Sequence, residues 1–216
     1  MKSILKQYFT KNTFGKKIYN LFLNSNFVGS EKYWEKRYKN NGDSGVGSYG
    51  IAADYKANFI NNFVLKQSID SVVELGCGDG NQLKQLNFKN YIGFDVSPTI
   101  ITKCKEIFAD DKTKRFYHFD IFHSSLNEFK HDLTISLDVI YHLIEDEVFE
   151  KYMHSLFQAS KKWVIIYSWD VEGKRSGHVR QRNFSKWVHE NIKDFEMHEC
   201  VKSPSFCDFV VYKKVL

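Results

Sequence analysis

Prolines, patterned cysteines and long apolar runs are scarce in this chain of 216 residues. It has two prolines, and its four cysteines at 77, 104, 200 and 207 form no C-x-x-C pair and no regular framework. We therefore expect free thiols in a reducing compartment. No apolar run approaches the ~20 residues that cross a bilayer, and the N-terminus lacks the apolar core and cleavage site of a secretory signal. These absences predict a cytoplasmic protein.

Acidic residues are missing from positions 1–24, which carry five lysines. The other 192 residues balance at 26 basic and 26 acidic side chains, so the net charge of +5 comes from the N-terminal segment. A balanced remainder argues against a nucleic-acid partner, including structured RNA. Apolar residues between the lysines predict one or two amphipathic helices, interrupted near Gly15. Such a helix can lie over the domain with its lysines in water, or rest on an anionic membrane surface.

An alternation of strand and helix patterns fills the rest of the chain. The expected strands lie at 71–75, 91–95, 115–119, 132–138 and 162–168. The expected helices lie at 31–39, 51–66, 81–87, 98–108 and 145–158. This alternation predicts a parallel sheet with right-handed crossovers, and the segments 195–201 and 206–212 predict a terminal antiparallel hairpin. We expect a helical N-terminal extension and lid at 1–66, followed by one folding unit at 67–216.

A glycine turn follows the first predicted strand in the pattern E-x-G-x-G-x-G, from Glu74 to Gly80. Glycines let the backbone turn tightly and approach a ligand closely, although such a turn can also simply join a strand to a helix. The next strand ends in Asp95, which can accept both hydroxyls of a ribose. A dinucleotide fingerprint read from Gly76 needs a third glycine where this chain has Asn81. The spacing therefore predicts a nucleoside site of another kind.

This pattern resembles motif I of the class I S-adenosylmethionine-dependent methyltransferases, and four segments follow in that family's order across 71–143. The resemblance implies an α/β, Rossmann-like fold with a mostly parallel seven-stranded sheet, an antiparallel terminal hairpin and a helical N-terminal extension. It implies S-adenosyl-L-methionine as cofactor and S-adenosyl-L-homocysteine as product. In that family an acid at the position of Asp95 holds the ribose. An acid at the position of Asp120, at the end of the third expected strand, accepts a hydrogen bond from the adenine amino group. The cofactor-binding residues implied are Glu74, Gly76, Cys77, Gly78, Asp95, Val96, Asp120, Ile121 and Leu137.

The segment from Tyr33 to Gly50 is similar to the W-x-x-R-Y and G-S-Y-G patterns of one group of small bacterial methyltransferases. Its dense glycines predict a lid that closes over a ligand, with Tyr49 or Arg37 meeting the methionine carboxylate of the cofactor. The alternative is a flexible surface connection with aromatic residues packed beneath it.

A basic segment at 169–187 follows the fifth predicted strand. Ligands of an open parallel sheet bind beyond the carboxyl ends of the strands, so this segment should border the pocket. Arg180 and Arg182 point to the same side of an extended chain and could grip phosphate or carboxylate oxygens, with His178 and Tyr141 beside them. A solvated basic loop is the alternative.

The chemistry that the resemblance implies is an in-line displacement at a methyl carbon, which depends largely on positioning. A sugar hydroxyl benefits from a general base, and His142 is the candidate, with Asp138 either orienting it or lining the cofactor pocket. A purely structural His142 is the alternative. An ionised phosphate-type oxygen instead needs cationic anchors.

Several acceptor classes do not fit the sequence. Ser136-Leu137-Asp138-Val139 replaces the N-P-P-Y signature of exocyclic amine methylation, and Val171 replaces an asparagine of metal-assisted catechol methylation, so no metal is expected. The resemblance is nearest to methyltransferases of bacterial capsule and surface-glycan biosynthesis, some associated with an O-methyl phosphoramidate group. It implies an O-methyltransferase acting on a small phosphate- or phosphoramidate-bearing precursor. The alternatives are a sugar-hydroxyl methyltransferase and a non-catalytic S-adenosylmethionine-binding partner subunit.

Overall fold

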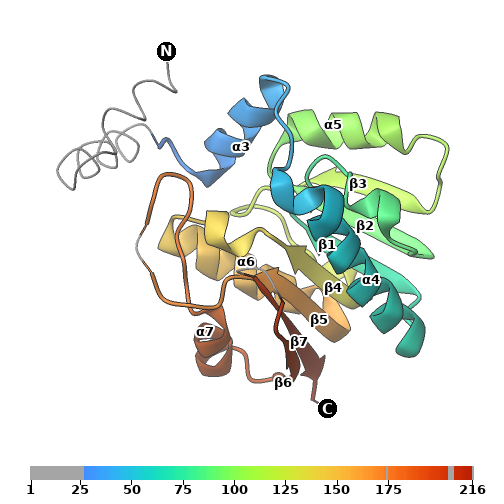
Figure 1. Ribbon diagram of the computed structural model, residues 1–216, viewed down its shortest axis with the longest axis vertical. Helices are drawn as coiled ribbons and strands as arrows, with labels where there is room; N and C mark the ends of the chain where they lie inside the picture. Colours follow the sequence, from blue (N-terminus) through green and yellow to red (C-terminus); the bar gives the residue numbers. More distant parts are fainter. Residues whose placement is uncertain (1–26, 174, 204–206, 216) are drawn as a thin grey trace.

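The computed structural model describes residues 27–173, 175–203 and 207–215. The amphipathic segment expected at 1–24 lies outside these ranges. The described strands form one seven-stranded sheet in the order β3-β2-β1-β4-β5-β7-β6 (Figure 1). Their bounds are β1 Ser71–Leu75, β2 Asn90–Asp95, β3 Lys114–His118, β4 His131–Leu137, β5 Ser160–Ser168, β6 Phe195–Val201 and β7 Asp208–Lys214.

The strands β1 to β5 run parallel, and β7 is antiparallel to both of its neighbours, β5 and β6. The chain crosses from β1 to β2 on one side and returns to β4 on the other. The strand order therefore reverses at β1, and the carboxyl ends of β1, β2 and β4 flank the place where open α/β sheets bind ligands.

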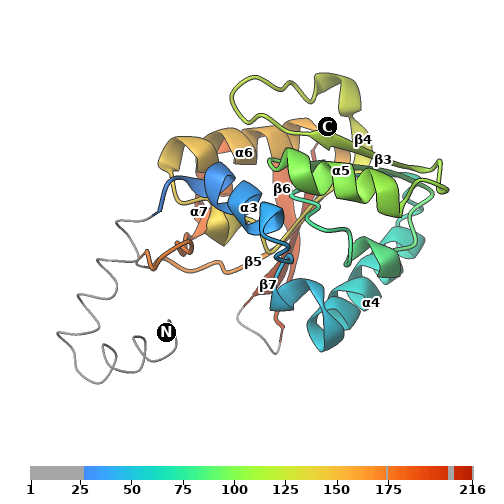
Figure 2. The ribbon, with the colours of Figure 1, turned by 90° about the horizontal axis from the view of Figure 1, so that it is seen from above.

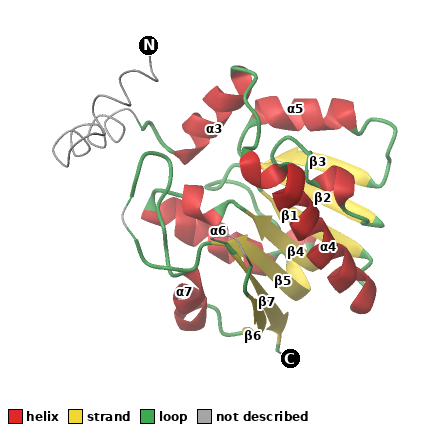
Figure 3. Ribbon diagram, in the orientation of Figure 1, coloured by secondary structure: helices red, strands yellow, loops and turns green. Residues whose placement is uncertain are grey.

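Helices cover both faces of the sheet (Figure 3). Their bounds are α3 Ser30–Lys39, α4 Gly50–Lys66, α5 Pro98–Ile107, α6 Asp146–Gln158 and α7 Phe184–Asn191, and short 3-10 turns lie at 46–48, 83–85, 127–129 and 140–142. No helix within the described ranges is long and apolar enough to cross a membrane.

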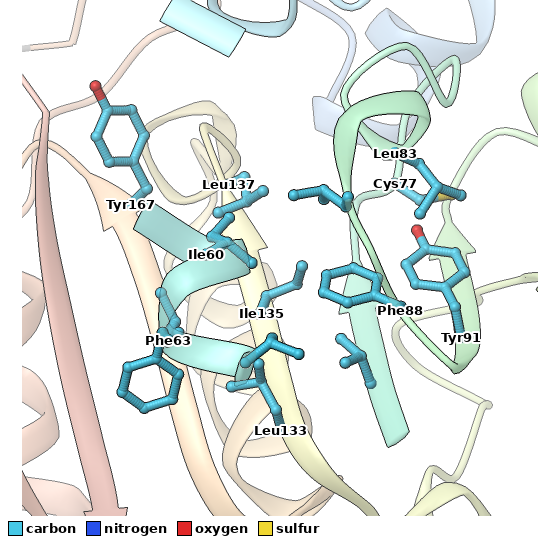
Figure 4. Packing of buried hydrophobic residues seen from close by; sticks show 14 of the residues in the cluster. Ile60, Phe63, Cys77, Leu83, Phe88, Tyr91, Leu133, Ile135, Leu137 and Tyr167 are labelled. Carbon is cyan, nitrogen blue, oxygen red and sulfur yellow. The ribbon is translucent and has the colours of Figure 1, made fainter. Parts of the chain in front are cut away.

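Two apolar clusters hold the helices to the sheet. Successive strand residues point to opposite faces, so Val72 belongs to one cluster and Val73 to the other. On the first face, Ile60 and Phe63 of α4 pack against residues of β4 and β5 (Figure 4). The second face is covered by α6 and α7, and the view from above shows α6 on the opposite side of the sheet from α4 (Figure 2).

The helix predicted at 81–87 is wrong. The structure has only a 3-10 turn, Leu83–Gln85, in the connection between β1 and β2. The side chain of Asn61, on α4, donates to the carbonyl of Gln85 at 2.8 Å and accepts from the amide of Asn87 at 2.9 Å. Because α4 supplies these hydrogen bonds and covers this face itself, the connection is held without a crossover helix.

The basic segment at 169–187 also differs from the prediction, because it ends in a helix. Helix α7 begins at Phe184, and the Asn183 side chain caps it by accepting from the amide of Lys186 at 3.0 Å. Phe184 and Val188 turn inward and are buried. The apolar spacing of these two residues, one helical turn apart, is the pattern that the sequence analysis missed.

Candidate functional site

A cavity of about 310 Å³ lies at the carboxyl ends of β1, β2 and β4, where the strand order reverses. Most of the predicted cofactor residues line it. Those that do so are Glu74, Gly76, Cys77, Gly78, Asp95, Val96, Ile121 and Leu137. The glycine turn and the strand ends that the sequence predicted as the cofactor site therefore lie at this cavity.

The glycine turn forms the wall of this cavity beyond β1. Gly76 and Gly78 have φ angles of +81° and +56°, a region that side chains strongly disfavour. A Cβ atom on Gly76 would lie 2.4 Å from Cγ2 of Val139, and one on Gly78 would lie 2.3 Å from the hydroxyl of Ser44. Both the backbone conformation and the tight packing require glycine here.

Asp95 is tied directly to this turn. One of its carboxylate oxygens accepts from the amide of Gly78 and the other from the amide of Ser97, both at 3.0 Å. Burial raises the pKa of Asp95 to about 6, against the lowering effect of these two hydrogen bonds. Each oxygen retains a free lone pair, so the carboxylate can still accept two ligand hydroxyls.

Glu74 lies beneath the turn, in the interior of the protein. Its carboxyl accepts a hydrogen bond from the hydroxyl of Tyr91 at 2.6 Å. Burial raises the pKa of Glu74 to about 7, while the Tyr91 hydrogen bond and the nearby Lys56 ammonium oppose the rise. This side chain therefore holds β1 to β2 under the cavity floor.

Lys56 and Asp138 form a buried ion pair at the opposite end of the floor, by the tip of β4. The Lys56 ammonium lies 2.5 Å from the Asp138 carboxylate and is 1% exposed. The other Asp138 oxygen accepts from the hydroxyl of Tyr141 at 3.0 Å. Asp138 has a φ angle of +60°, so its backbone is strained at this point.

These contacts decide between the two predicted roles of Asp138. Its carboxylate lines the cavity and is held by Lys56 and Tyr141, and it does not orient the ring of His142. Of the two roles predicted for Asp138, the contacts fit the lining of the cavity and not the orientation of His142. The ring of His142 instead takes its orientation from a backbone carbonyl.

His142 lines the same cavity, on the loop after β4. Its Nδ1 atom lies 3.0 Å from the carbonyl oxygen of His178, its ring stacks on that of His178, and Trp34 meets it edge-on at 4.9 Å. Burial lowers the pKa of His142 to about 4. The ring is therefore neutral near pH 7.

Helix α3 lines one side of the cavity and is hydrogen-bonded at two places to the segments around it. Ser30, at its first turn, donates its hydroxyl to Glu145 at 2.6 Å and its backbone amide to the same carboxylate at 3.0 Å. Further along, Glu35 accepts from Ser97 and from Thr99 at the start of α5. Both views show α3 lying beside α5 (Figures 1 and 2). Trp34 and Tyr38, on the same helix, line the cavity.

Three predicted cofactor contacts lie elsewhere. The Asp120 carboxylate accepts from the amide of Phe122 and contacts His123, and its side chain is 44% exposed. Arg37 pairs with Asp43 at 2.8 Å, and the Tyr49 hydroxyl donates to Asp79 at 2.7 Å. These side chains do not line the cavity; the last two brace the loop at 40–50.

The predicted acceptor-binding side chains are also placed outside the cavity. Arg182 is 8% exposed and donates to the carbonyls of residues 143 and 144 and to Asp146, while Arg180 contacts the same Asp146 at 3.0 Å. Their positive charges are therefore engaged by the protein itself, so the structure does not support the predicted anion grip. His178 and Tyr141 reach the site only indirectly, by stacking on His142 and by holding Asp138.

Sequence reasoning missed Lys56, Gln82 and the helix α3 contacts. Lys56 lies between Ala53 and Ile60 on the inward face of α4, at a position where the helical spacing calls for an apolar residue. A lysine on such a face was the available signal. Gln82 had no comparable signal. Its position depends on the 3-10 turn at Leu83–Gln85, where the sequence predicted a helix.

Residues 72–162 match the family model described as a methyltransferase domain. No curated protein matches the chain in sequence.

Several solved structures share the fold. The N-methyltransferase NodS from Bradyrhizobium japonicum WM9, in complex with S-adenosyl-L-homocysteine, has a TM-score of 0.69 at 16% identity, covering 86% of this chain and 98% of its own. Magnesium protoporphyrin IX methyltransferase from Synechocystis PCC 6803, with bound SAM, has a TM-score of 0.62 at 16% identity, covering 88% and 99%. An S-adenosylmethionine-dependent methyltransferase from Clostridium acetobutylicum ATCC 824 has a TM-score of 0.59 at 16% identity, covering 73% and 90%. The predicted fold class is confirmed.

Proposed function

We propose that this protein is an S-adenosylmethionine-dependent O-methyltransferase that acts on a hydroxyl group. The premise is that residues 72–162 match a methyltransferase domain and that the chain has a Rossmann-like methyltransferase fold. One observation carries the proposal. Asp95 with the glycine turn, and a neutral histidine, His142, line the same cavity at the reversal of strand order.

The residues fit the cofactor in several ways. Asp95 is oriented by two backbone amides to accept ribose hydroxyls, and Phe119, Ile121 and Phe122 give the cavity an apolar wall for a flat base. The cofactor supplies an electrophilic methyl group on a sulfonium sulfur. The chain's own contribution is to hold the nucleoside, to orient the acceptor and to accept its proton.

The charge of the cavity favours a neutral acceptor over an anionic one. Among the described lining residues, Glu31, Glu74, Asp95, Asp138 and Glu145 carry carboxyl groups, and only Lys32 and Lys56 carry amino groups. An acidic cavity attracts a sulfonium and disfavours a phosphorylated acceptor. Since Arg180 and Arg182 bind the segment at 143–146, the hydroxyl acceptor is the better supported of the two predicted acceptors.

His142 is suited to serve that hydroxyl. Its Nδ1 faces a carbonyl oxygen, which can only accept, so the ring proton lies on Nδ1 and the lone pair on Nε2. A neutral ring with a lone pair on Nε2 can accept the hydroxyl proton as the new bond to carbon forms. The role in surface-glycan biosynthesis that the sequence resemblance implies stays a prediction.

Calorimetry and a turnover assay test the proposal. We expect the full-length protein to bind S-adenosyl-L-homocysteine in calorimetry. In the turnover assay we expect it to produce S-adenosyl-L-homocysteine from S-adenosyl-L-methionine when glycosides with free hydroxyls are supplied, and to produce less of it with the matched sugar phosphates. Binding without release for any acceptor would favour the non-catalytic partner subunit. Absence of binding would overturn the proposal.

A further inference from the structure

The outward face of α3 is basic. Lys32, Lys36 and Lys39 recur at helical spacing and are exposed to solvent. On the inward face of the same helix, Trp34 and Tyr38 line the cavity. The helix that covers one side of the cavity therefore presents a stripe of three ammonium groups to the outside.

Nearby carboxylates offset part of this charge. Glu31 is exposed on the first turn of α3, and Glu35 contacts Lys39 at 3.0 Å. Asp43, on the loop after the helix, pairs with Arg37 at 2.8 Å. The described part of this surface is therefore only weakly positive, and most of its charge must come from the segment that precedes it.

That preceding segment is strongly basic. Residues 1–24 contain five lysines and no acid. The described chain starts at Phe27, whose ring centroid lies 4.7 Å from the guanidinium carbon of Arg175. Val28 comes next, and it lines the cavity although its side chain is 62% exposed, so it lies at the cavity rim. The basic segment therefore joins the described chain at this rim, directly before α3.

Large apolar side chains are exposed on the segment that follows α3. Val46 is 92% exposed, and it lies between Ser44 and Ser48, which line the cavity. Ile51, on the first turn of α4, is 88% exposed. Single exposed apolar residues are common on proteins, but with Val28 these residues lie on the two segments that flank α3, next to the basic segment. Apolar residues gathered beside positive charge are typical of a membrane-binding surface.

From this combination we propose that the α3 side of the protein binds an anionic lipid bilayer. A bilayer surface accommodates both features, because its anionic headgroups attract lysines and its acyl boundary accepts apolar side chains. A nucleic acid would bind the lysines but leave Val46 and Ile51 in water, and a second copy of the chain would bring like charges together. The inference goes beyond the proposed function, and it places the cavity rim at the lipid headgroups.

Co-sedimentation with lipid vesicles tests the binding. We expect the full-length protein to bind phosphatidylcholine vesicles containing about one-third phosphatidylglycerol at least tenfold more tightly than pure phosphatidylcholine vesicles. This preference should disappear in about 0.5 M salt, which screens the lysines. Equal binding to both vesicles, binding to neither, or tighter binding to RNA than to the anionic vesicles would overturn the inference. Calorimetry with S-adenosyl-L-homocysteine is a separate measurement, so the proposed function can stand without the membrane.

A matched pair of variants tests which face of the protein meets the lipid. We expect the double variant Val46→Ser, Ile51→Ser to bind anionic vesicles about tenfold more weakly, with S-adenosyl-L-homocysteine affinity changed less than twofold. Leu65→Ser is the control, because Leu65 is 80% exposed on α4 but lies about 20 Å further along this helix. Helix α4 ends there at the opposite edge of the sheet, where β1 begins (Figure 1). An unchanged double variant, or an equal loss in Leu65→Ser, would contradict binding through the α3 side.

Discussion

His142 and His178 are joined through a ring nitrogen and a backbone carbonyl, 3.0 Å apart, with their rings stacked almost parallel. A carbonyl oxygen cannot donate, so this contact fixes the proton of His142 on Nδ1 and leaves Nε2 as the proton acceptor. The loop at 176–179, closed on itself by the bridge between Ser176 and Val179, presents that carbonyl. The basic loop that was expected to bind the acceptor instead sets the tautomer of His142.

Replacing His142 should reduce the rate and spare the cofactor. We expect His142→Asn to lower kcat by about 100-fold or more, because a general base contributes at least that much, and to change S-adenosyl-L-homocysteine affinity less than twofold. Steady-state kinetics and calorimetry give the two values. His189→Asn, on α7 and away from the cavity, is the control. A His142→Asn enzyme with full activity would remove the proton-acceptor role.

Cofactor affinity should rise with pH through the titration of Asp95. Burial places the pKa of this carboxyl at about 6, and only its ionised form can accept two ribose hydroxyls. At pH 5 about a tenth of the free protein is ionised there, so S-adenosyl-L-homocysteine should bind up to about tenfold more weakly than at pH 7.5. In Asp95→Asn we expect at least tenfold weaker binding at pH 7.5 and a flatter pH profile. An Asp95→Asn protein with wild-type affinity would refute the ribose assignment.

Arg182 should matter for stability far more than Arg180. Losing Arg182 removes the side-chain donor to the buried carbonyl of Leu143 and leaves the carbonyl of Ile144 with Arg180 as its side-chain donor, so Arg182→Met should lower the free energy of unfolding by about 3 kcal/mol. The side chain of Arg180 is 30% exposed, and Arg180→Met should cost about 1 kcal/mol or less. Denaturant unfolding of the two variants compares these values. Equal costs would show that the buried hydrogen bonds of Arg182 are not the cause.

Glu35 should control how firmly α3 is docked. The hydrogen bonds from Ser97 and Thr99, with that from Lys39, hold the pKa of Glu35 at about 2 despite the opposing effect of burial. Glu35→Gln removes the charge that strengthens these contacts, so we expect about tenfold faster hydrogen exchange across α3 with exchange in β1 and β4 unchanged. Glu31→Gln, on the first turn of the same helix, is the control. Faster exchange throughout the protein would indicate general destabilisation instead.

The sequence predicted the elements whose signal is local. Apolar runs such as Ser71–Leu75 predicted the strands correctly. The glycines at 76 and 78 and Asp95 were predicted as site residues, and they line the cavity. The prediction of a helix at 81–87 was based on the helical composition of these residues. The helix does not form, because contacts with α4 decide the conformation of this segment. Local propensity is a weak guide where tertiary contacts are strong.

Charged residues were harder to place because their partners are distant in sequence. Arg182 is paired with Asp146 and Lys56 with Asp138, separations of 36 and 82 residues. A run of arginines looks the same in a sequence whether it binds a ligand or a neighbouring loop. Only the fold shows that two of these arginines, Arg180 and Arg182, share the carboxylate of Asp146 and that one buried lysine, Lys56, lines the cavity.

Helix α3 has a kinetic consequence. It bridges the tips of β2 and β4 through Glu35 and Ser30, so a molecule seated on the cavity floor lies beneath it. We expect exchange of that molecule to need the undocking of one end of α3, because residues of this helix line the cavity and its ends are hydrogen-bonded on both sides. Under the proposed function we therefore expect the methylated acceptor to leave before the spent cofactor, and the undocking of α3 to limit the release of that cofactor.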